Sequence, residues 1–276
     1  MSLMSENNTF PPVFIINLEH SAERRIAMAA QLDSMHLNYT FSKAVDGHEI
    51  DLDNLPSYSK LRRRLFFGRD LTKGEMGCLL SHRAIYQHLV DANINSAIVL
   101  EDDAILEPNF PDVINALITT PIKWDVIRFL SREKVLQDSR QIGRLFGAYS
   151  LIRPTKAYGG AYAYLLTRHA ARTFLKHMQS NWLPVDILHG HVWSTGLETF
   201  AVRPSAVYPN TVIESTIGES RFDKTVHLSG WQRAVYPLTR ASFKVYEQLG
   251  KRTASLLAWT RDIRIKWQLR HKINSL

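Results

Sequence analysis

The stretch Ala97-Ile98-Val99-Leu100-Glu101-Asp102-Asp103 joins an apolar run directly to three carboxylates. The run Ala97–Leu100 predicts a buried β-strand. Adjacent carboxylates repel each other and are costly to desolvate unless a cation compensates them. Because hard oxygen ligands suit Mg²⁺ and Mn²⁺, the cluster predicts a divalent-metal site able to hold a diphosphate. A solvated strand-to-loop turn explains the same residues equally well.

Other apolar runs and helix signals surround this stretch. Val13–Leu18 predicts the first strand, and Ser21 is the expected N-cap of the helix that follows. Thr72 and Glu75 have the spacing of a capping box at the start of another helix. Residues 52–69 mix Pro, Ser and an Arg run, which predicts an irregular segment. Further strands are predicted at Tyr39–Phe41, Asp125–Leu130 and Gly160–Leu166, and a further helix at about Arg168–His177.

Strands that alternate with helices favour an α/β fold with a largely parallel sheet. In open α/β sheets, ligands bind beyond the carboxyl ends of the strands. Asn17 and the Glu101-Asp102-Asp103 cluster follow two strand ends, and Arg24 and Arg25 lie in the first helix. We therefore expect these side chains to converge on one crevice.

Composition limits the class of protein. The chain has 276 residues, of which 45% are hydrophobic, so it is long enough for one large globular domain. Cys78 is the single cysteine, which excludes an intrachain disulfide and fits a reducing compartment. Met1–Pro12 is polar and predicts no secretory signal. Since no run approaches ~18 apolar residues, no transmembrane helix is expected.

The net charge of +8 is unevenly distributed. Residues 240–276 carry nine Lys or Arg and two Asp or Glu, a net of +7, which leaves +1 for residues 1–239. This asymmetry predicts a main domain at 1–239 and a basic tail at 240–276. In the tail Leu256, Trp259, Ile263 and Trp267 share one helical face among Arg and Lys, a pattern typical of membrane-surface helices. A helix packed on the body, or a dimer contact, explains the pattern too.

Several blocks occur in an order and spacing that resemble glycosyltransferase family 25. This family contains bacterial lipooligosaccharide galactosyl- and glucosyltransferases and the related collagen galactosyltransferases of animals. The resemblance spans about Val13 to Pro209 and excludes the tail. The strong blocks are Phe14–Leu18 with Arg24-Arg25, Ala44–Gly47, Leu71–His82 and Val99–Asp103, and the weaker ones are Trp124–Arg128, Gly160–Tyr164 and Pro184–Asp186.

The resemblance implies a GT-A-type, Rossmann-like sheet with flanking helices, to which this chain adds its basic helical tail. It also implies an inverting transfer of a hexose, galactose or glucose, from a UDP-sugar to a lipooligosaccharide or lipopolysaccharide core. Such a transfer uses Mn²⁺ or Mg²⁺ to stabilise the leaving diphosphate and one base to deprotonate the acceptor hydroxyl. The enzyme would be cytoplasmic and peripheral to the inner membrane. Its expected partners are UDP-hexose, the acceptor and an anionic membrane surface, and no nucleic acid.

The resemblance also suggests roles for residues at the crevice. Asp103 is the expected direct metal ligand, and Glu101 and Asp102 would bind the ribose or metal-bound water. Asn17, Arg24 and Arg25 would meet the nucleotide, although an exposed helix face explains each arginine as well. His82 is expected either to face the crevice or to pack in the core, and Cys78 to be a small core residue.

The expected base is Asp186, after Pro184-Val185, although a helix N-cap is an equally good explanation of this residue. Glu214 and Asp125 are rival bases, and a turn role suits Asp125 at least as well. A late histidine is the expected additional metal ligand, and we choose His191 over His189 and His227, although a histidine that is merely hydrogen-bonded is commoner.

Two other functional classes remain open. The basic tail suits a nucleic-acid- or membrane-binding module, although a body charge of +1 argues against a broad phosphate-binding surface. A catalytically dead sugar-binding homologue would carry the same blocks as an enzyme.

Overall fold

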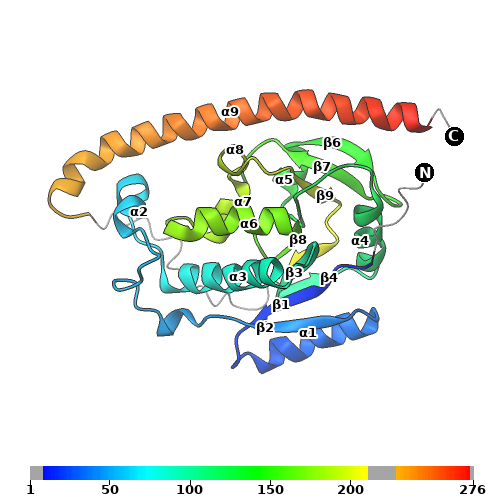
Figure 1. Cartoon of the computed structure of the whole chain (residues 1–276), viewed down its shortest axis with the longest axis horizontal. Coiled ribbons are helices and arrows are strands. Elements are labelled where there is room, and N and C mark those ends of the chain that lie inside the picture. Colours follow the sequence, from blue (N-terminus) through cyan, green and yellow to red (C-terminus); the bar gives the residue numbers. More distant parts are fainter. Residues whose placement is uncertain (1–8, 211–227, 274–276) are drawn as a thin grey trace.

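A computed structural model describes residues 9–210 and 228–273 of the chain. Its centre is an eight-stranded sheet with the strand order β2-β1-β3-β8-β5-β9-β7-β6 (Figure 1). A separate antiparallel pair is formed by β4 (Ala104–Leu106) and β10 (Val207–Pro209). The central strands are β1 (Val13–Asn17), β2 (Tyr39–Lys43), β3 (Ser96–Glu101), β5 (Val126–Arg128), β6 (Ser139–Arg144), β7 (Ser150–Pro154), β8 (Ala163–Thr167) and β9 (Thr199–Arg203).

Most strands of the sheet run in one direction. β1 is parallel to β2 and β3, and β5 is parallel to β9, whereas β8 runs antiparallel between β3 and β5. β7 runs antiparallel between β9 and β6, so only β8 and β7 oppose the other six strands. The predicted α/β class is confirmed, with a mixed sheet. The carboxyl ends of β1, β3 and β5 lie at one edge, which Asn17, Glu101 and Arg128 reach.

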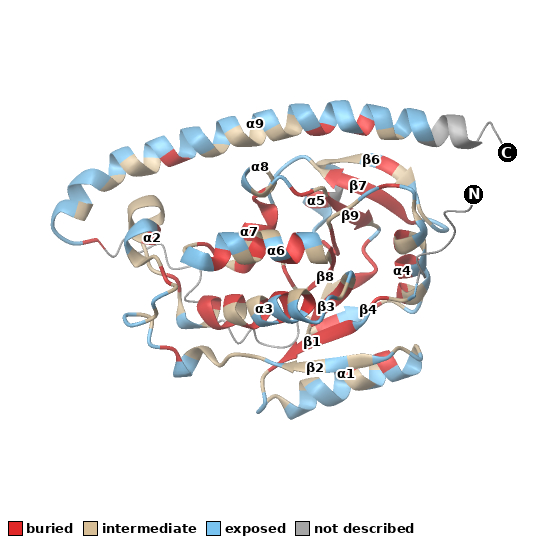
Figure 2. Ribbon diagram, in the orientation of Figure 1, coloured by how far each residue is buried: buried red, intermediate tan, exposed pale blue. Residues whose placement is uncertain are grey.

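Both faces of the sheet are covered, because alternate strand residues enter two apolar clusters. Ile15 and Leu100 pack with α1 and α4, whereas Ile16 and Val99 pack with α3 and α6. Figure 2 shows buried strands between partly exposed helices. The helices are α1 (Ala22–Ser34), α2 (Lys60–Phe67), α3 (Lys73–Asp91), α4 (Phe110–Thr119), α5 (Glu133–Gln137), α6 (Arg168–His177), α7 (Val185–Gly190), α8 (Val192–Thr195) and α9 (Trp231–Ile273), with 3₁₀ turns η1 (Gly47–Glu49) and η2 (Met178–Ser180).

The local helix signals have mixed outcomes. The capping box is confirmed: the Glu75 amide donates to Thr72 Oγ1 at 3.0 Å and the Thr72 amide to Glu75 Oε2 at 2.8 Å. Ser21 precedes α1 as predicted, but its side chain makes no capping hydrogen bond. The prediction of an irregular 52–69 segment is wrong for Lys60–Phe67, which is helical.

Long-range contacts with α9 explain why α2 forms. Arg240 Nη1 donates to the Phe66 carbonyl at 2.8 Å, and the Phe66 and Phe67 rings pack against Phe243. These partners lie far away in the sequence, so a local pattern does not report them. Gly68 then ends α2 in the left-handed region, at φ 76°.

The predicted basic tail belongs to α9, a helix of 43 residues that begins before the tail does, at Trp231. It runs along the body and contacts α2, α8 and β6 (Figure 1). The buried Asp262 carboxylate accepts hydrogen bonds from Arg140 Nε at 3.0 Å and Arg153 Nε at 2.8 Å. The predicted domain boundary at 239/240 therefore falls inside a helix that is packed on the body. None of the helices in the described ranges is both long and apolar enough to cross a membrane.

Candidate functional site

A cavity of about 570 Å³ lies at the carboxyl ends of β1 and β3. Five segments meet around it: the end of β1, the end of β3, the start of α1, the turn that contains η1, and the amino end of α3. Its charged lining includes Arg24, Asp46, Lys73 and the carboxylates Glu101, Asp102 and Asp103.

One wall of the cavity depends on close packing between α3 and the 44–47 turn. A Cβ on Gly77 would lie 2.7 Å from the Val45 carbonyl oxygen, and one on Gly47 would lie 2.6 Å from that of Lys73. The Val45 amide also donates to Ser81 Oγ at 2.8 Å. Two blocks of the sequence pattern, Ala44–Gly47 and Leu71–His82, are therefore in contact, and their glycines are required for steric reasons.

Asp102 is held by two of the predicted nucleotide-site residues. Its carboxylate accepts from Asn17 Nδ2 at 2.8 Å and from Arg24 Nη1 at 3.3 Å. The structure thus brings Asn17 and Arg24 to the acidic strand end. Arg25 takes a different place, with its guanidinium over the Phe41 ring at 4.1 Å, and does not line this cavity.

Asp103 differs from its neighbour. Its Oδ1 is buried and has no hydrogen-bond partner among the described residues. Burial, and then repulsion from Glu101 and Asp102, raises the pKa of the Asp103 carboxyl to about 7. A buried carboxylate oxygen without a partner is a hard ligand atom of the kind that a divalent cation binds, and Glu101 is the neighbouring carboxylate that Asn17 and Arg24 leave free to join it. The residues present therefore fit Mg²⁺ or Mn²⁺.

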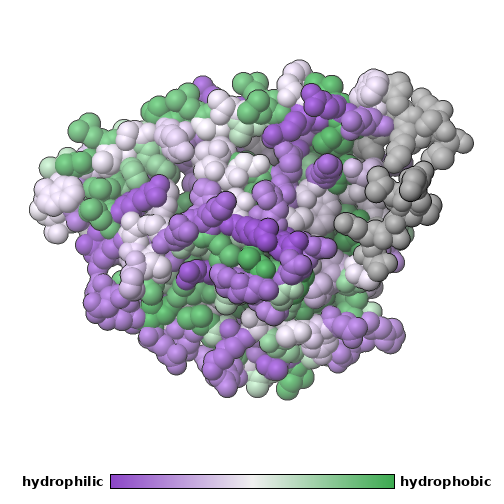
Figure 3. Space-filling view, viewed as in Figure 1, coloured by the Kyte–Doolittle hydropathy of each residue, from purple (hydrophilic) through white to green (hydrophobic). Residues whose placement is uncertain are grey.

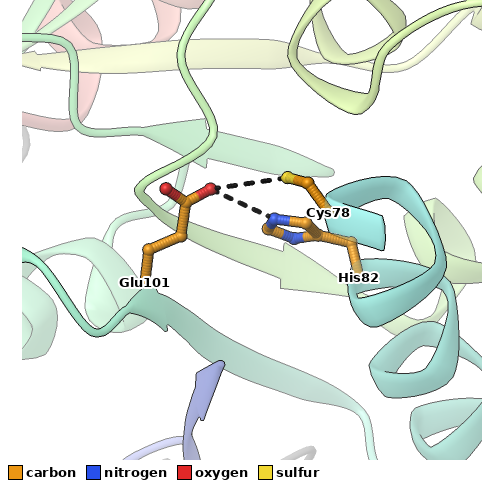
Figure 4. Close-up of side chains that lie close together, drawn as sticks. All are labelled: Cys78, His82 and Glu101. Atoms are coloured by element: carbon orange, nitrogen blue, oxygen red, sulfur yellow. Dashed lines mark hydrogen bonds and ion pairs between the residues drawn. The ribbon is translucent and has the colours of Figure 1, made fainter. Parts of the chain in front are cut away.

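A second group of metal-ligand types lies at the same place. Cys78 and His82, one turn apart on α3, point toward Glu101 from β3 (Figure 4). His82 Nε2 lies 3.3 Å from Glu101 Oε1, and Cys78 Sγ lies 3.9 Å from the same oxygen. Burial and the nearby carboxylates raise the pKa of the Cys78 thiol, so it stays protonated at neutral pH unless a cation displaces the proton.

His82 also begins a buried polar chain. His82 Nδ1 lies 2.6 Å from Tyr164 Oη. The Tyr164 hydroxyl lies 2.8 Å from Tyr86 Oη, and the Tyr86 hydroxyl in turn lies 2.7 Å from His189 Nε2. His82 thus both packs in the core and lines the cavity. Cys78, expected to be a core residue, is half-buried and also lines the cavity. The Cys-x-x-x-His spacing on a predicted helix was the signal for this pair.

Asp186, the predicted base, is the second residue of α7. A Cβ on Gly159 would lie 2.6 Å from Asp186 Oδ2, so the Gly159-Gly160 loop passes directly over this carboxylate. Asp186 does not itself line the acidic cavity, but its negative charge adds to the raised pKa of Cys78, which does. Asp186 accepts from the neighbouring Ile187 amide at 2.7 Å, whereas the N-cap position of α7 is occupied by Pro184.

Arg128 is a residue of this region that the sequence reasoning missed. It ends β5, is buried, and donates from Nη2 to the Gly160 carbonyl at 2.6 Å. Burial lowers its pKa to about 10, and the negative charge of Asp186 opposes that shift. A basic residue at a strand's carboxyl end was the available signal.

The remaining predicted residues lie elsewhere. The His191 ring lies 4.2 Å from the Trp193 ring and lines a different cavity, so the structure does not bring it to Asp103. His189 is buried among aromatic rings. Asp125 Oδ2 accepts from the Glu198 amide at 2.8 Å, which is a turn role. Glu214 and His227 lie outside the described residues.

Residues 10–189 match a protein family described as "Glycosyltransferase family 25 (LPS biosynthesis protein)". The chain is 30% identical over 226 residues to "Probable inactive glycosyltransferase 25 family member 3" of Rattus norvegicus, covering 72% of this chain and 38% of the relative. It is 28% identical over 258 residues to "Procollagen galactosyltransferase 1-B" of Xenopus laevis, covering 82% and 41%. The chain thus spans about two fifths of the length of these curated relatives.

Proposed function

Because the chain belongs to glycosyltransferase family 25, we propose that it is an inverting hexosyltransferase that moves galactose or glucose from a UDP-sugar to a saccharide acceptor. The observation that carries this proposal is the buried Asp103 oxygen without a partner, beside Glu101 and Asp102 in a large cavity at the sheet edge.

In this proposal Asp103 and Glu101 hold Mn²⁺ or Mg²⁺. When bound, the cation stabilises the charge that grows on the leaving diphosphate. Asn17 and Arg24 fix Asp102, which then accepts a hydrogen bond from the ribose. Lys73 and the amino end of α3 line the same cavity, and a helix N-terminus attracts phosphate groups. Arg25 and His191 are left out because they lie away from the cavity.

We assign the base role to Asp186. Its carboxylate takes the proton of the acceptor hydroxyl while that oxygen bonds to C1 of the hexose. The C1–O bond to UDP breaks on the opposite face, so the configuration at C1 inverts and UDP leaves with the bonding electron pair. The bare Gly159 leaves room for this carboxylate, and Arg128 holds the following residue, Gly160.

We further propose a lipooligosaccharide core as acceptor, and a cytoplasmic location peripheral to the inner membrane. Two facts support this choice: the matched family is described as an LPS biosynthesis family, and the C-terminal helix is basic. One relative is named a procollagen galactosyltransferase, which supports galactose as the first donor to test.

The test is a panel of UDP-sugars with a truncated lipooligosaccharide acceptor, with Mn²⁺, with Mg²⁺ and with chelator, read by the mass of the product. We expect a single hexose addition that needs the metal and is lost in Asp103→Asn. Asp91→Asn, an exposed carboxylate at the end of α3, is the matched control and should keep full activity. Transfer that persists in chelator would contradict the metal role.

An inactive sugar-binding homologue is the second candidate, since the rat relative is named as probably inactive. Calorimetry with UDP-hexose and Mn²⁺ measures binding, which both candidates share, and the transfer assay then separates the two. Binding without transfer to any acceptor and without hydrolysis would favour the binding protein over the enzyme.

A further inference from the structure

The side of α9 that faces away from the body carries a stripe of exposed apolar side chains. We call these seven residues the outer stripe. Successive members are three, four or seven positions apart, which keeps them on one side of a helix. Each is between 49% and 74% exposed: Leu238, Val245, Leu249, Leu256, Trp259, Ile263 and Trp267.

The opposite side of α9 is the one that packs on the body. Phe243 is buried against the Phe66 and Phe67 rings of α2, and Asp262 is buried between Arg140 and Arg153. Gly250 lies so close to α8 that a Cβ would be 2.5 Å from Trp193 Cδ1. The outer stripe is therefore the solvent-facing side of a helix whose opposite side packs on the body. Figure 2 shows the largely exposed α9 against the side of the body.

The charges around the stripe are of one sign. Among the described side chains of α9, the two acids face inward: Asp262 is buried, and Glu247 pairs with Lys251 at 2.9 Å. Over residues 231–268 of the helix, whose side chains the structure describes, the exposed charged residues are all basic, namely Arg233, Lys244, Arg252, Arg261, Arg264 and Lys266. Figure 3 shows hydrophobic and hydrophilic side chains interspersed along this edge of the molecule.

We propose that the outer stripe is a docking surface for an anionic lipid bilayer, with α9 lying in the plane of the interface. Apolar residues that include two tryptophans would enter the headgroup boundary, and the flanking cations would meet anionic headgroups. A second copy of the chain is the less favourable occupant, because two symmetry-related helices would place rows of like charge together.

This docking does not use a flexible tail. The Asp262 ion pairs and the close approach at Gly250 hold α9 against β6, β7 and α8. Attachment through the outer stripe would therefore hold the whole body at one orientation to the bilayer. The inference deepens the membrane-peripheral location proposed above, and it stands independently of glycosyl transfer because it concerns a surface away from the acidic cavity.

The experiment is co-sedimentation of the full chain with vesicles of phosphatidylcholine alone and of phosphatidylcholine mixed with phosphatidylglycerol. We expect binding to the anionic vesicles that falls at least tenfold when salt is raised from ~0.1 M to ~1 M, where screening is strong. The double variant Trp259→Glu/Ile263→Glu should bind at least tenfold more weakly. Ile26→Glu on α1, where Ile26 is 69% exposed, is the matched control and should bind like the parent.

A charge variant and an oligomer measurement complete the test. Lys244→Glu/Arg252→Glu keeps the stripe and should also lose binding to anionic vesicles. Circular dichroism checks that each variant keeps the helix content of the parent. If Trp259→Glu/Ile263→Glu loses helix content, Trp259→Gln is used in its place. Equal binding to neutral and anionic vesicles would overturn the proposal. A dimer in sedimentation velocity that the stripe variants dissociate would assign the face to a second copy instead.

Discussion

At the scale of single residues, three consecutive carboxylates differ because their partners differ. Asp102 is satisfied by Asn17 and Arg24, Glu101 lies against His82, and Asp103 keeps a buried oxygen without a partner in the described chain. Chemically similar neighbours can therefore have different roles, set by the elements that reach them.

Asp103→Asn should lower kcat for hexosyl transfer by about 10²–10³-fold or more, the range for losing one key electrostatic contact to the transition state. Asn is nearly isosteric, so the effect would come from the lost charge. Titration of activity with Mn²⁺ measures both kcat and metal affinity. If Asp103→Asn kept the metal affinity of the parent, another residue would be the ligand.

Cys78→Ser tests the softer donor group. Because a hard cation has little need of a protonated thiol, we expect Mn²⁺-supported activity within about threefold of the parent. The Mn²⁺ and Zn²⁺ affinities of the Cys78→Ser variant are measured and compared with those of the parent. A large loss of Zn²⁺ affinity together with activity would identify Cys78 as a ligand.

Gly159→Ala tests the position of the proposed base. The new Cβ would lie 2.6 Å from Asp186 Oδ2, so the carboxylate must move. We expect kcat to fall at least tenfold, since an ångström-scale displacement of a reacting group is costly. The KM for UDP-hexose should stay unchanged, and thermal unfolding should confirm the fold. Full activity would exclude Asp186 as the base at this geometry.

The sequence predicted the strand-end residues better than the other site residues, for a physical reason. Parallel strands bring their carboxyl ends to one edge of the sheet, so Asn17 and the acidic cluster lie close together regardless of the loop conformations. Arg24 and Arg25 lie about 100° apart around α1, so only one of them faces the cavity. Two adjacent arginines alone do not indicate which of them faces the sheet edge. The position of His191 depends on α9, which is distant in sequence.

At the scale of elements, α3 is held against the 44–47 turn by the absence of a side chain at Gly77. We expect Gly77→Ala to destabilise the fold by about 1–3 kcal/mol, the usual cost of overpacking, because its Cβ would meet backbone rather than a movable side chain. Thermal unfolding and the KM for UDP-hexose measure the effect on the fold and on the cavity wall. An unchanged melting temperature would mean that the 44–47 turn moves to accommodate the new Cβ without a loss of stability.

His191, between α7 and α8, gives the fold a pH dependence. Burial lowers its pKa from 6.5 to about 4 against the opposing charge of Glu247, and Lys251 adds to the lowering, so the folded state binds this proton less tightly than the unfolded chain. Its stabilising contribution is present above pH 6.5 and is lost as pH falls toward 4. Between these two pKa values the free energy of unfolding changes by up to about 1.4 kcal/mol per pH unit. Urea unfolding at several pH values should show a flatter profile for His191→Gln.

The sequence predicted the elements with strong local signals and missed one that depends on distant contacts. The Thr72–Glu75 capping box and the Arg168–His177 helix appear as expected. α2 was missed because its two phenylalanines find their partners on α9, more than a hundred residues later. Local propensity does not contain that information.

At the scale of the whole molecule, α9 is joined to the sheet through buried charge. Asp262→Ala would leave Arg140 without this partner and Arg153 with Glu198 as its remaining ion pair. We expect a loss at or below the lower end of the ~3–5 kcal/mol that breaking a buried pair costs, because Glu198 remains. Chemical unfolding measures it. Hydrogen exchange should show faster opening of α9 than of β3.

The overall fold class was predictable, but the order of the strands was not. Alternating apolar runs and helix signals favour α/β whichever strands pair. The reversal of β8 and β7, and the eight-stranded order, follow from long-range pairing that no local pattern specifies. The C-terminal pattern predicted a basic amphipathic helix and left its packing on the body open as an alternative, whereas the start of the helix at Trp231 came from the structure.

The position of β8 has a consequence for how the chain reaches its fold during synthesis. β3 and β5 are not neighbours, because β8 separates them, yet β8 is made after both. Until Thr167 has left the ribosome, β3 presents an unpaired apolar edge that invites association with other chains. Nascent chains that stop before residue 163 should therefore be aggregation-prone, and those that extend past it should gain protease resistance in one step.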